Sequence, residues 1–227
     1  MIDPRLAVID TETTGLEATD EVIEVGVVTE TLGNAWYFSA SKPIPAEVSA
    51  VHHIVDADVA GRPLFRDYAP VLRDELHRNG VQVLVAHNAD FDRKMLGEEF
   101  VDFEWICTFK CALHVFPDAP NHKNETLCYH LGVGALGRSG RSGNAHSAQF
   151  DACQTKAILE ELLKHASIEQ MIAWTKDIKN IQKLPFGKHA GKKWAEIDGG
   201  YLMWMIKAAD MDPDMRELAS RELKRRR

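Results

Sequence analysis

Two acids that follow an apolar run are the first residues in this sequence whose types and spacing could do chemistry. In the stretch VIDTETTGLE, Asp10 and Glu12 come directly after Val8 and Ile9. Successive side chains of a strand alternate between its faces, so the two carboxylates point the same way. Like charges held this close repel each other. Either the strand ends in solvent here, or a divalent cation lies between the two carboxylates.

A further acid, Asp92, lies in the passage AHNADFDRKML. We expect the strand before it to end at His87 and Asn88, and Asp92 to stand at the start of the following helix. Its carboxylate then projects at the C-terminal edge of a strand, where α/β sheets place their ligands.

The passage NAHSAQFDACQ places His146 five positions before Asp151. Five residues correspond to about 500° of helical rotation, so the two side chains cannot share one helix face. We therefore expect Asp151 in the first turn of a long helix, with His146 on the glycine-rich loop before it. Ser147 is the expected N-cap of that helix.

Together these residues predict a metal site. Four carboxylates that converge without lysine or arginine among them repel one another unless metal ions neutralise them. Ligand sets made only of oxygen select hard ions, so we expect Mg²⁺ or Mn²⁺ rather than zinc. The four acids are Asp10, Glu12, Asp92 and Asp151.

Three motifs, DTETTGL, HNADFD and HSAQFD, occur in the order found in the DnaQ-like DEDDh family of 3′–5′ exonucleases and resemble its three exonuclease motifs. The later segments FGKHAGKKWAEI and GGYLMWMI also resemble sequences of that family, so the resemblance covers nearly the whole chain. It implies an RNase H-like fold, two Mg²⁺ or Mn²⁺ ions, and release of nucleoside 5′-monophosphates from the 3′ ends of single-stranded or duplex DNA. Transferred residue by residue, the family's metal ligands fall on Asp10, Glu12, Asp92 and Asp151, and its general base falls on His146.

The resemblance also implies contacts with the terminal nucleotide. The residues concerned are Thr13, Gly15, Leu16, Val51, His52, Asn88 and Phe91. Leu16 could pack against the terminal base or be a surface leucine in a turn, and His52 could be a substrate contact or a packing histidine. Arg138 and Arg141 lie on the glycine-rich loop near His146 and are candidates for phosphate contact, because flexible cations there would approach the scissile strand.

The elements that must position these residues can be read from periodicity and turn signals. Five segments have the length and composition of strands: residues 6–12, 21–30, 35–41, 81–88 and 104–108. Short turns join the first three, which predicts antiparallel neighbours. Helical patterns separate the others, so we predict an α/β fold with a mixed five-stranded sheet flanked by helices. We expect this domain over residues 1–167, a helical linker over 168–183 and a small basic module over 184–227.

The charge of the chain is divided unevenly. The net charge is −7, but residues 179–227 carry 12 Lys or Arg against 7 Asp or Glu, a balance of +5, which leaves −12 for residues 1–178. An acidic body with a basic C-terminal part suggests a metal-binding catalytic domain joined to a module that binds a polyanion. The alternative is that the terminal RELKRRR is simply a solvated helix end.

Composition and the N-terminal sequence bear on the compartment. With 45% hydrophobic and 27% charged residues, the chain has the composition of a globular protein. The opening MIDPRLAVID lacks the basic and apolar regions of a signal peptide, and no apolar run is long enough to span a membrane, so we expect a cytoplasmic protein. Cys107 and Cys111, with His114 nearby, could form part of a zinc site, but the C-x3-C spacing is not the usual one and favours buried thiols.

Three other functions compete with a DNA exonuclease. An exoribonuclease of the same family would use the same ligands. A catalytically inert nucleic-acid-binding adaptor would be favoured by the loss of any one ligand, and none is lost. A phosphatase that used DTETT as its nucleophile motif would need a second aspartate at the position of Glu12.

Overall fold

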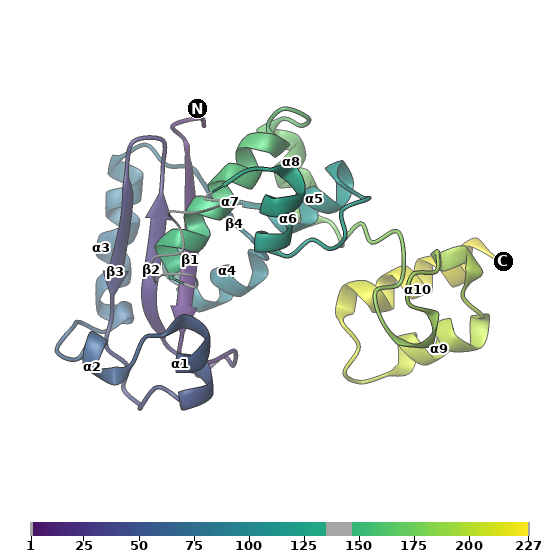
Figure 1. Cartoon of the computed structure of the whole chain (residues 1–227), viewed down its shortest axis with the longest axis horizontal. Coiled ribbons are helices and arrows are strands. Elements are labelled where there is room, and N and C mark those ends of the chain that lie inside the picture. Colours follow the sequence, from purple (N-terminus) through teal and green to yellow (C-terminus); the bar gives the residue numbers. More distant parts are fainter. Residues whose placement is uncertain (1, 135–146, 227) are drawn as a thin grey trace. The chain divides into compact units, whose positions relative to one another are not determined.

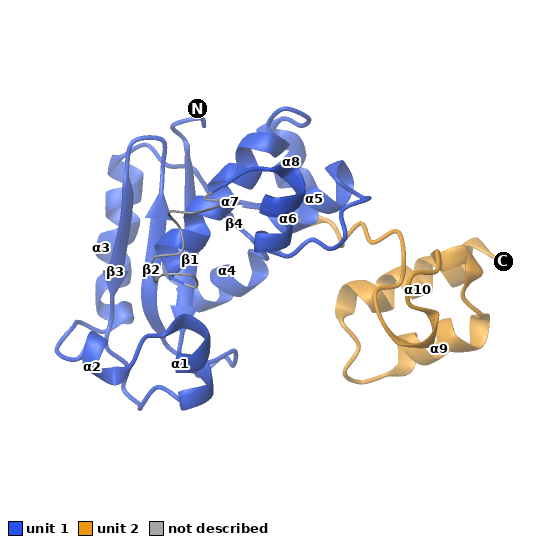
Figure 2. Ribbon diagram, in the orientation of Figure 1, with its two compact units in different colours: residues 1–175 blue, residues 176–227 orange. Residues whose placement is uncertain are grey.

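The computed structural model describes residues 2–134 and 147–226 (Figure 1). The chain divides into two compact units, residues 1–175 and residues 176–227 (Figure 2). Within these described parts, no helix combines the length and the hydropathy needed to cross a membrane.

The first unit is built on one five-stranded sheet. Its strands are β1 (Leu6–Thr13), β2 (Val22–Val28), β3 (Gly33–Tyr37), β4 (Val83–Ala86) and β5 (Glu104–Cys107). Their order in the sheet is β3-β2-β1-β4-β5, with β2 antiparallel to both β1 and β3, and with β1, β4 and β5 parallel. The predicted mixed sheet and the antiparallel pairing of the first three strands are therefore confirmed.

The third strand is shorter than the sequence predicts. It ends at Tyr37 instead of residue 41. Beyond it, Ser39 forms an isolated parallel bridge with Leu64, so the chain leaves β2 at that point.

Eight helices accompany the sheet in the described part of the first unit, and two more lie in the second. They are α1 (Ala46–His52), α2 (Asp56–Val59), α3 (Phe65–Arg78), α4 (Asp90–Leu96), α5 (Thr108–Val115), α6 (Asn124–Leu131), α7 (Ala148–Leu162), α8 (Ile168–Lys176), α9 (Gly199–Lys207) and α10 (Pro213–Arg225). Short 3₁₀ turns occur at Glu98–Phe100, Gly187–His189 and Trp194–Glu196.

Side chains alternate between the two faces along each strand, so the sheet contributes to two cores, one on each face. Ala7 and Ile9 of β1 pack with α3 residues such as Leu72. Leu6 and Val8 pack with residues of α5, α6 and α7. Figure 1 shows α7 crossing in front of β1 and β2. Because Asp10 and Glu12 continue the Leu6 and Val8 series, they point toward the α7 face.

The helix α8 belongs to the first unit. It was expected to be a connecting helix, but Met171 is fully buried in the core beneath α5 and α7, and the Thr175 hydroxyl accepts the N–H of Cys107 at 2.8 Å. The few apolar side chains of α8 are therefore enough to hold this helix on the first unit, because they pack against a core that other helices also form. The first unit ends at residue 175, eight residues beyond the expected boundary at 167.

The second unit has a small core of its own. Leu184, Leu202 and Met205 are fully buried against Met215 and Ala219. Helices α9 and α10 pack on each other in this unit. Each has an aspartate N-cap: Asp198 accepts the N–H of Tyr201, and Asp212 accepts that of Met215.

Candidate metal centre

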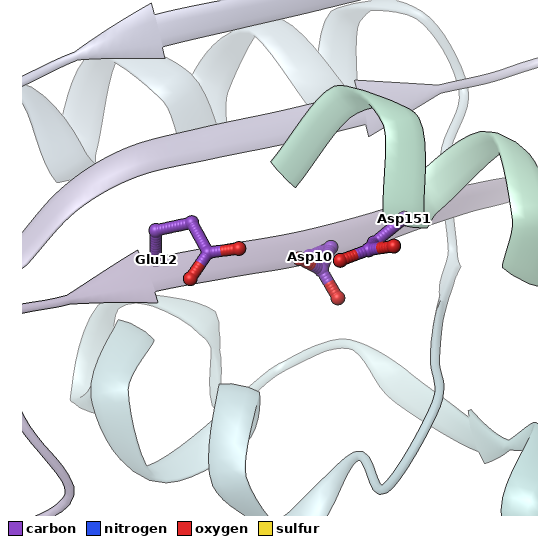
Figure 3. A group of neighbouring side chains, drawn as sticks. All are labelled: Asp10, Glu12 and Asp151. Carbon is purple, nitrogen blue, oxygen red and sulfur yellow. The ribbon is translucent and has the colours of Figure 1, made fainter. Parts of the chain in front are cut away.

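Three carboxylates meet on the α7 face of the sheet. Asp10 and Glu12 of β1 and Asp151 of α7 each offer an oxygen, and these oxygens lie within 4.8 Å of one another (Figure 3). The two strand residues share a face because they are two positions apart. Asp151 comes from a segment more than 130 residues later, so the site depends on how closely α7 approaches the strands.

A glycine allows that approach. Gly26 of β2 is paired with Asp10 across the sheet. A Cβ atom on Gly26 would lie 2.3 Å from the carbonyl carbon of Ala148, the first residue of α7. Only a residue without a side chain leaves room for the helix backbone here. The predicted N-cap is confirmed, since the Ser147 hydroxyl accepts the N–H of Phe150 at 3.3 Å.

A buried glutamate also holds the start of α7. Glu24 is paired with Glu12 on the neighbouring strand and has no exposed surface. Its Oε2 accepts the N–H of Ala148 at 3.0 Å. The sequence analysis did not select Glu24. The signal was available, because a lone carboxylate in the apolar strand VIEVGVV needs a polar partner when the strand is buried.

The fourth acid, Asp92, lies in the first turn of α4, directly after β4. It is 3% exposed, and the Thr11 hydroxyl donates to its Oδ1 at 2.9 Å. Asn88, between the strand and the helix, adopts a left-handed conformation with φ of 67°. The turn at Asn88 brings Asp92 back toward the end of β1. The structure thus places all four predicted acids at the same end of the two parallel strands.

The carboxylates raise one another's pKa. Burial, followed by the negative charges of Asp92 and Asp151, raises the pKa of Asp10 well above its ordinary value. Burial and the charge of Asp151 raise the pKa of Glu12 to about 8. Burial raises the pKa of Asp92 to about 7, although the Thr11 hydrogen bond opposes the rise. Such acids hold protons near neutral pH unless cations replace those protons.

Bound cations fit this arrangement. Among the described residues, no Lys or Arg forms an ion pair with Asp10, Glu12 or Asp92. The donor set consists of oxygen alone, which suits hard divalent ions. The alternative raised by the sequence was that the strand ends in solvent at these acids. The structure does not agree with it, because Asp92 is buried and Asp10 and Glu12 are half-buried.

The residues expected to contact the terminal nucleotide occupy different environments. Leu16 and Val51 are 75% and 55% exposed. His52 is buried, and its Nδ1 accepts the N–H of Ile54 at 3.0 Å, which suits a packing histidine. Asn88 is exposed and Phe91 is half-buried.

The turn after β1 is held internally. The Thr13 hydroxyl donates to the carbonyl of Gly15 at 2.6 Å. A side chain on Gly15 would meet the Asp20 carboxylate at 2.4 Å. The Leu16 carbonyl accepts from the Lys94 ammonium at 3.1 Å, which ties the turn to α4. These bonds leave the Leu16 side chain exposed beside the site.

Three predicted site residues, His146, Arg138 and Arg141, lie outside the described residues. The zinc alternative is not supported by the part of the chain that is described. Cys107 and Cys111 are buried free thiols, and the His114 ring stacks on Trp174 with 4.5 Å between ring centroids. No metal-ligating group that includes these three side chains is found there.

Comparison with known proteins agrees with the fold and the carboxylate site. The family model RNase_T, described as exonuclease, matches residues 7–159. A structure of exonuclease X in complex with 5′ overhanging duplex DNA is 30% identical, with a TM-score of 0.63, and its match covers 75% of this chain and 99% of that chain. The structure of exonuclease I, 14% identical with a TM-score of 0.56, shares the fold.

The fold and its acidic site thus define a DnaQ-like 3′–5′ exonuclease, a phosphodiester hydrolase with an RNase H-like sheet. The chain belongs to the RNase_T exonuclease family. The family resemblance of the sequence is therefore confirmed.

Curated relatives match over different lengths. Exodeoxyribonuclease 10 of Escherichia coli (strain K12) is 32% identical over 220 residues, which cover 93% of this chain and 95% of that protein. The DNA polymerase III subunit epsilon of Treponema pallidum (strain Nichols) is 32% identical over 173 residues, which cover 69% of this chain and 75% of that protein. The first unit makes up 175 of the 227 residues, or about 77%, so the match with Exodeoxyribonuclease 10 extends into the second unit.

Proposed function

We propose that this exonuclease degrades DNA from its 3′ end by hydrolysis that depends on two Mg²⁺ or Mn²⁺ ions. The observation that carries the proposal is the convergence of three carboxylates from two distant segments within 4.8 Å, in a chain of this family. DNA is favoured over RNA because one relative is named an exodeoxyribonuclease and one similar structure contains duplex DNA.

The chain's own carboxylates would hold the ions. Asp10 and Glu12 offer oxygens from β1, Asp151 offers one from α7, and Asp92 completes the set from α4. When bound, two divalent ions supply positive charge to the attacking and leaving oxygens and make a water more acidic. The protein contributes the rigid placement of the acids, since α7 and α4 each pack directly on β1.

His146 is the proposed general base. It would take one proton from the attacking water, whose oxygen forms a bond to the phosphorus of the last phosphodiester. The bond from phosphorus to the 3′ oxygen of the preceding nucleotide breaks, and that oxygen takes up a proton from solvent. The products are a nucleoside 5′-monophosphate and a strand that is one nucleotide shorter with a free 3′ hydroxyl. An imidazole pKa near 6.5 makes the neutral base available at neutral pH.

We also propose that the basic C-terminal part binds the nucleic-acid substrate. Its balance of +5 over residues 179–227 contrasts with the acidic first unit. Contacts between lysine or arginine and phosphates raise affinity without reading sequence. The Mg²⁺ site and the phosphate-binding surface would then act on the same strand.

The proposed function can be tested with three matched oligonucleotides of the same sequence: single-stranded DNA, duplex DNA and RNA. Each carries a label at its 5′ end and is digested over time with Mg²⁺. We expect a ladder that shortens from the 3′ end, faster on DNA than on RNA. Equal or faster digestion of RNA would make the protein an exoribonuclease of the same family. Failure to shorten any of the three would favour an inert adaptor.

A further inference from the structure

Helix α9 carries two neighbouring aromatic side chains, and Trp204 lies outside the core. Leu202 and Met205 on one face are fully buried, whereas Trp204 is 51% exposed. The helical spacing in GGYLMWMI favours Tyr201 and Trp204 as core residues over stacking platforms. In the structure Tyr201 is half-buried, and the Trp204 ring lies 5.0 Å from it at a tilt of 43°. An exposed tryptophan beside a tyrosine is an apolar surface that the described unit does not cover.

A glycine loop places a cation over the Tyr201 ring. The Lys188 ammonium lies 5.2 Å from the centroid of the Tyr201 ring. Gly187, with φ of 69°, passes so close to the ring that a Cβ atom would lie 2.3 Å from the tyrosine hydroxyl. His189 packs edge-on against the same ring at 4.7 Å, and its Nε2 is 2.8 Å from the Asp198 carboxylate. The Lys188 ammonium thus lies beside the Tyr201 ring and 3.9 Å from the Asp198 carboxylate.

Three more lysines lie next to this loop, residues 184–191, in the sequence. Two backbone hydrogen bonds join the two sides of the loop: the Leu184 N–H donates to the carbonyl of Lys192 at 2.9 Å, and the Gly191 N–H donates to the carbonyl of Leu184 at 2.8 Å. Lys183 and Lys193 are bridge partners on its two sides. Within the described residues, Lys183, Lys192 and Lys193 form no ion pair with an acid. Three lysines without acidic partners attract a polyanion.

We propose that Tyr201, Trp204 and Lys188 form a stacking site for an unpaired base of the nucleic-acid substrate, with the lysines of the loop on the adjacent phosphates. Aromatic faces stack on bases of any sequence, and a nearby cation strengthens the contact. The base is unpaired because a paired base already stacks on its neighbours within the duplex. A protein partner is disfavoured, since the unpaired lysines give the surface a charge that suits phosphates. This inference rests on the proposed function, because it takes the exonuclease substrate as the ligand.

The test compares binding of two strands by the full chain in a buffer that contains a chelator, so that hydrolysis does not occur. One strand is a labelled thymidine 12-mer, and the other has the same phosphates but abasic sugars. We expect Trp204→Ala to weaken binding of the thymidine strand by about 5- to 150-fold, the range for loss of one stacked base. Binding of the abasic strand should not change. Trp204→Phe should restore most of the affinity, because phenylalanine keeps an aromatic face.

The neighbouring Met203, which is 40% exposed on the same helix, provides the matched control. Met203→Ala should bind both strands like the wild-type protein. Equal affinity of the Trp204→Ala variant and the wild-type protein for the thymidine strand would overturn the stacking site. An equal loss on both strands would also overturn it, because the defect would then not involve bases. Hydrolysis of a trinucleotide by the wild-type protein with Mg²⁺, measured in parallel, reports on the proposed function separately.

Discussion

Asp10 and Gly26 are direct partners across β1 and β2, and the absent side chain of Gly26 leaves the space in which α7 begins. We predict that Gly26→Ala displaces the first turn of α7, because the new methyl group would lie 2.3 Å from the Ala148 backbone. Overpacking of this kind costs about 1–3 kcal/mol of stability. The shift of Asp151 should reduce turnover by about 10² fold, the effect of a misplacement near 1 Å. Thermal unfolding and steady-state kinetics measure the two effects.

Gly33→Ala is the control for that variant. At Gly33, in β3, a Cβ atom would meet only the end of the flexible Gln149 side chain, at 3.3 Å. Its activity should stay close to that of the wild-type protein. If Gly26→Ala also kept full activity, the close approach of α7 would not be needed for the site.

Removal of the Asp10 carboxylate should abolish catalysis but stabilise the metal-free protein. We predict that Asp10→Asn abolishes hydrolysis because it removes a proposed metal ligand. In a chelator the same variant should unfold at a higher temperature than the wild-type protein, since burial and four neighbouring acids disfavour the Asp10 carboxylate. A variant that turned over substrate near the wild-type rate would contradict the assignment of Asp10.

The metal-free protein should become less stable as the pH rises. The pKa of Glu12 is raised from 4.5 to about 8 in the folded protein, so the folded state holds a proton that the unfolded chain releases. The free energy of unfolding should therefore fall between about pH 4.5 and pH 8 and level off above that range. Unfolding temperatures measured with a chelator, from pH 5 to pH 9, test this slope. Glu12→Gln should reduce the slope without removing it, because the pKa values of Asp10 and Asp92 are raised as well. An unchanged slope in that variant would show that Glu12 does not contribute to it.

Glu24 should act through its hydrogen bond to α7. Glu24→Ala leaves the N–H of Ala148 buried without its acceptor, a loss of about 1–3 kcal/mol. Glu24→Gln keeps a carbonyl oxygen that can accept from this N–H, so it should recover most of the stability and turnover. Stability and kcat of both variants are compared. If the glutamine variant were as inactive as the alanine variant, the negative charge itself would be required.

The strand that carries the site could be predicted from sequence with little ambiguity. Alternation puts Asp10 and Glu12 on one face whatever the rest of the fold, and the end of a parallel strand places Asp92 at the same edge. Ser147 marks the start of α7 because a serine before an amphipathic period is a usual N-cap. These inferences need only local geometry, and the observed elements agree with them.

The features that depend on register or packing could not be predicted in this way. The pairing of Glu24 with Glu12 is set by the β1–β2 register, which no short segment specifies. The burial of Met171 depends on a core assembled from distant helices. The exposure of Trp204 depends on which face of α9 meets α10, whereas its helical spacing from Tyr201 favours a place in the core.

The central claim, that the four acids hold divalent ions, is tested most directly by locating Mn²⁺ in crystals of the full chain grown with MnCl₂ and thymidine 5′-monophosphate. Anomalous scattering measured at the manganese absorption edge identifies the ions independently of the protein density. We predict two peaks in contact with the carboxylates of Asp10, Glu12, Asp92 and Asp151, and none in crystals of Asp10→Asn. Manganese bound elsewhere, with no peak among these carboxylates at saturating MnCl₂, would contradict the claim.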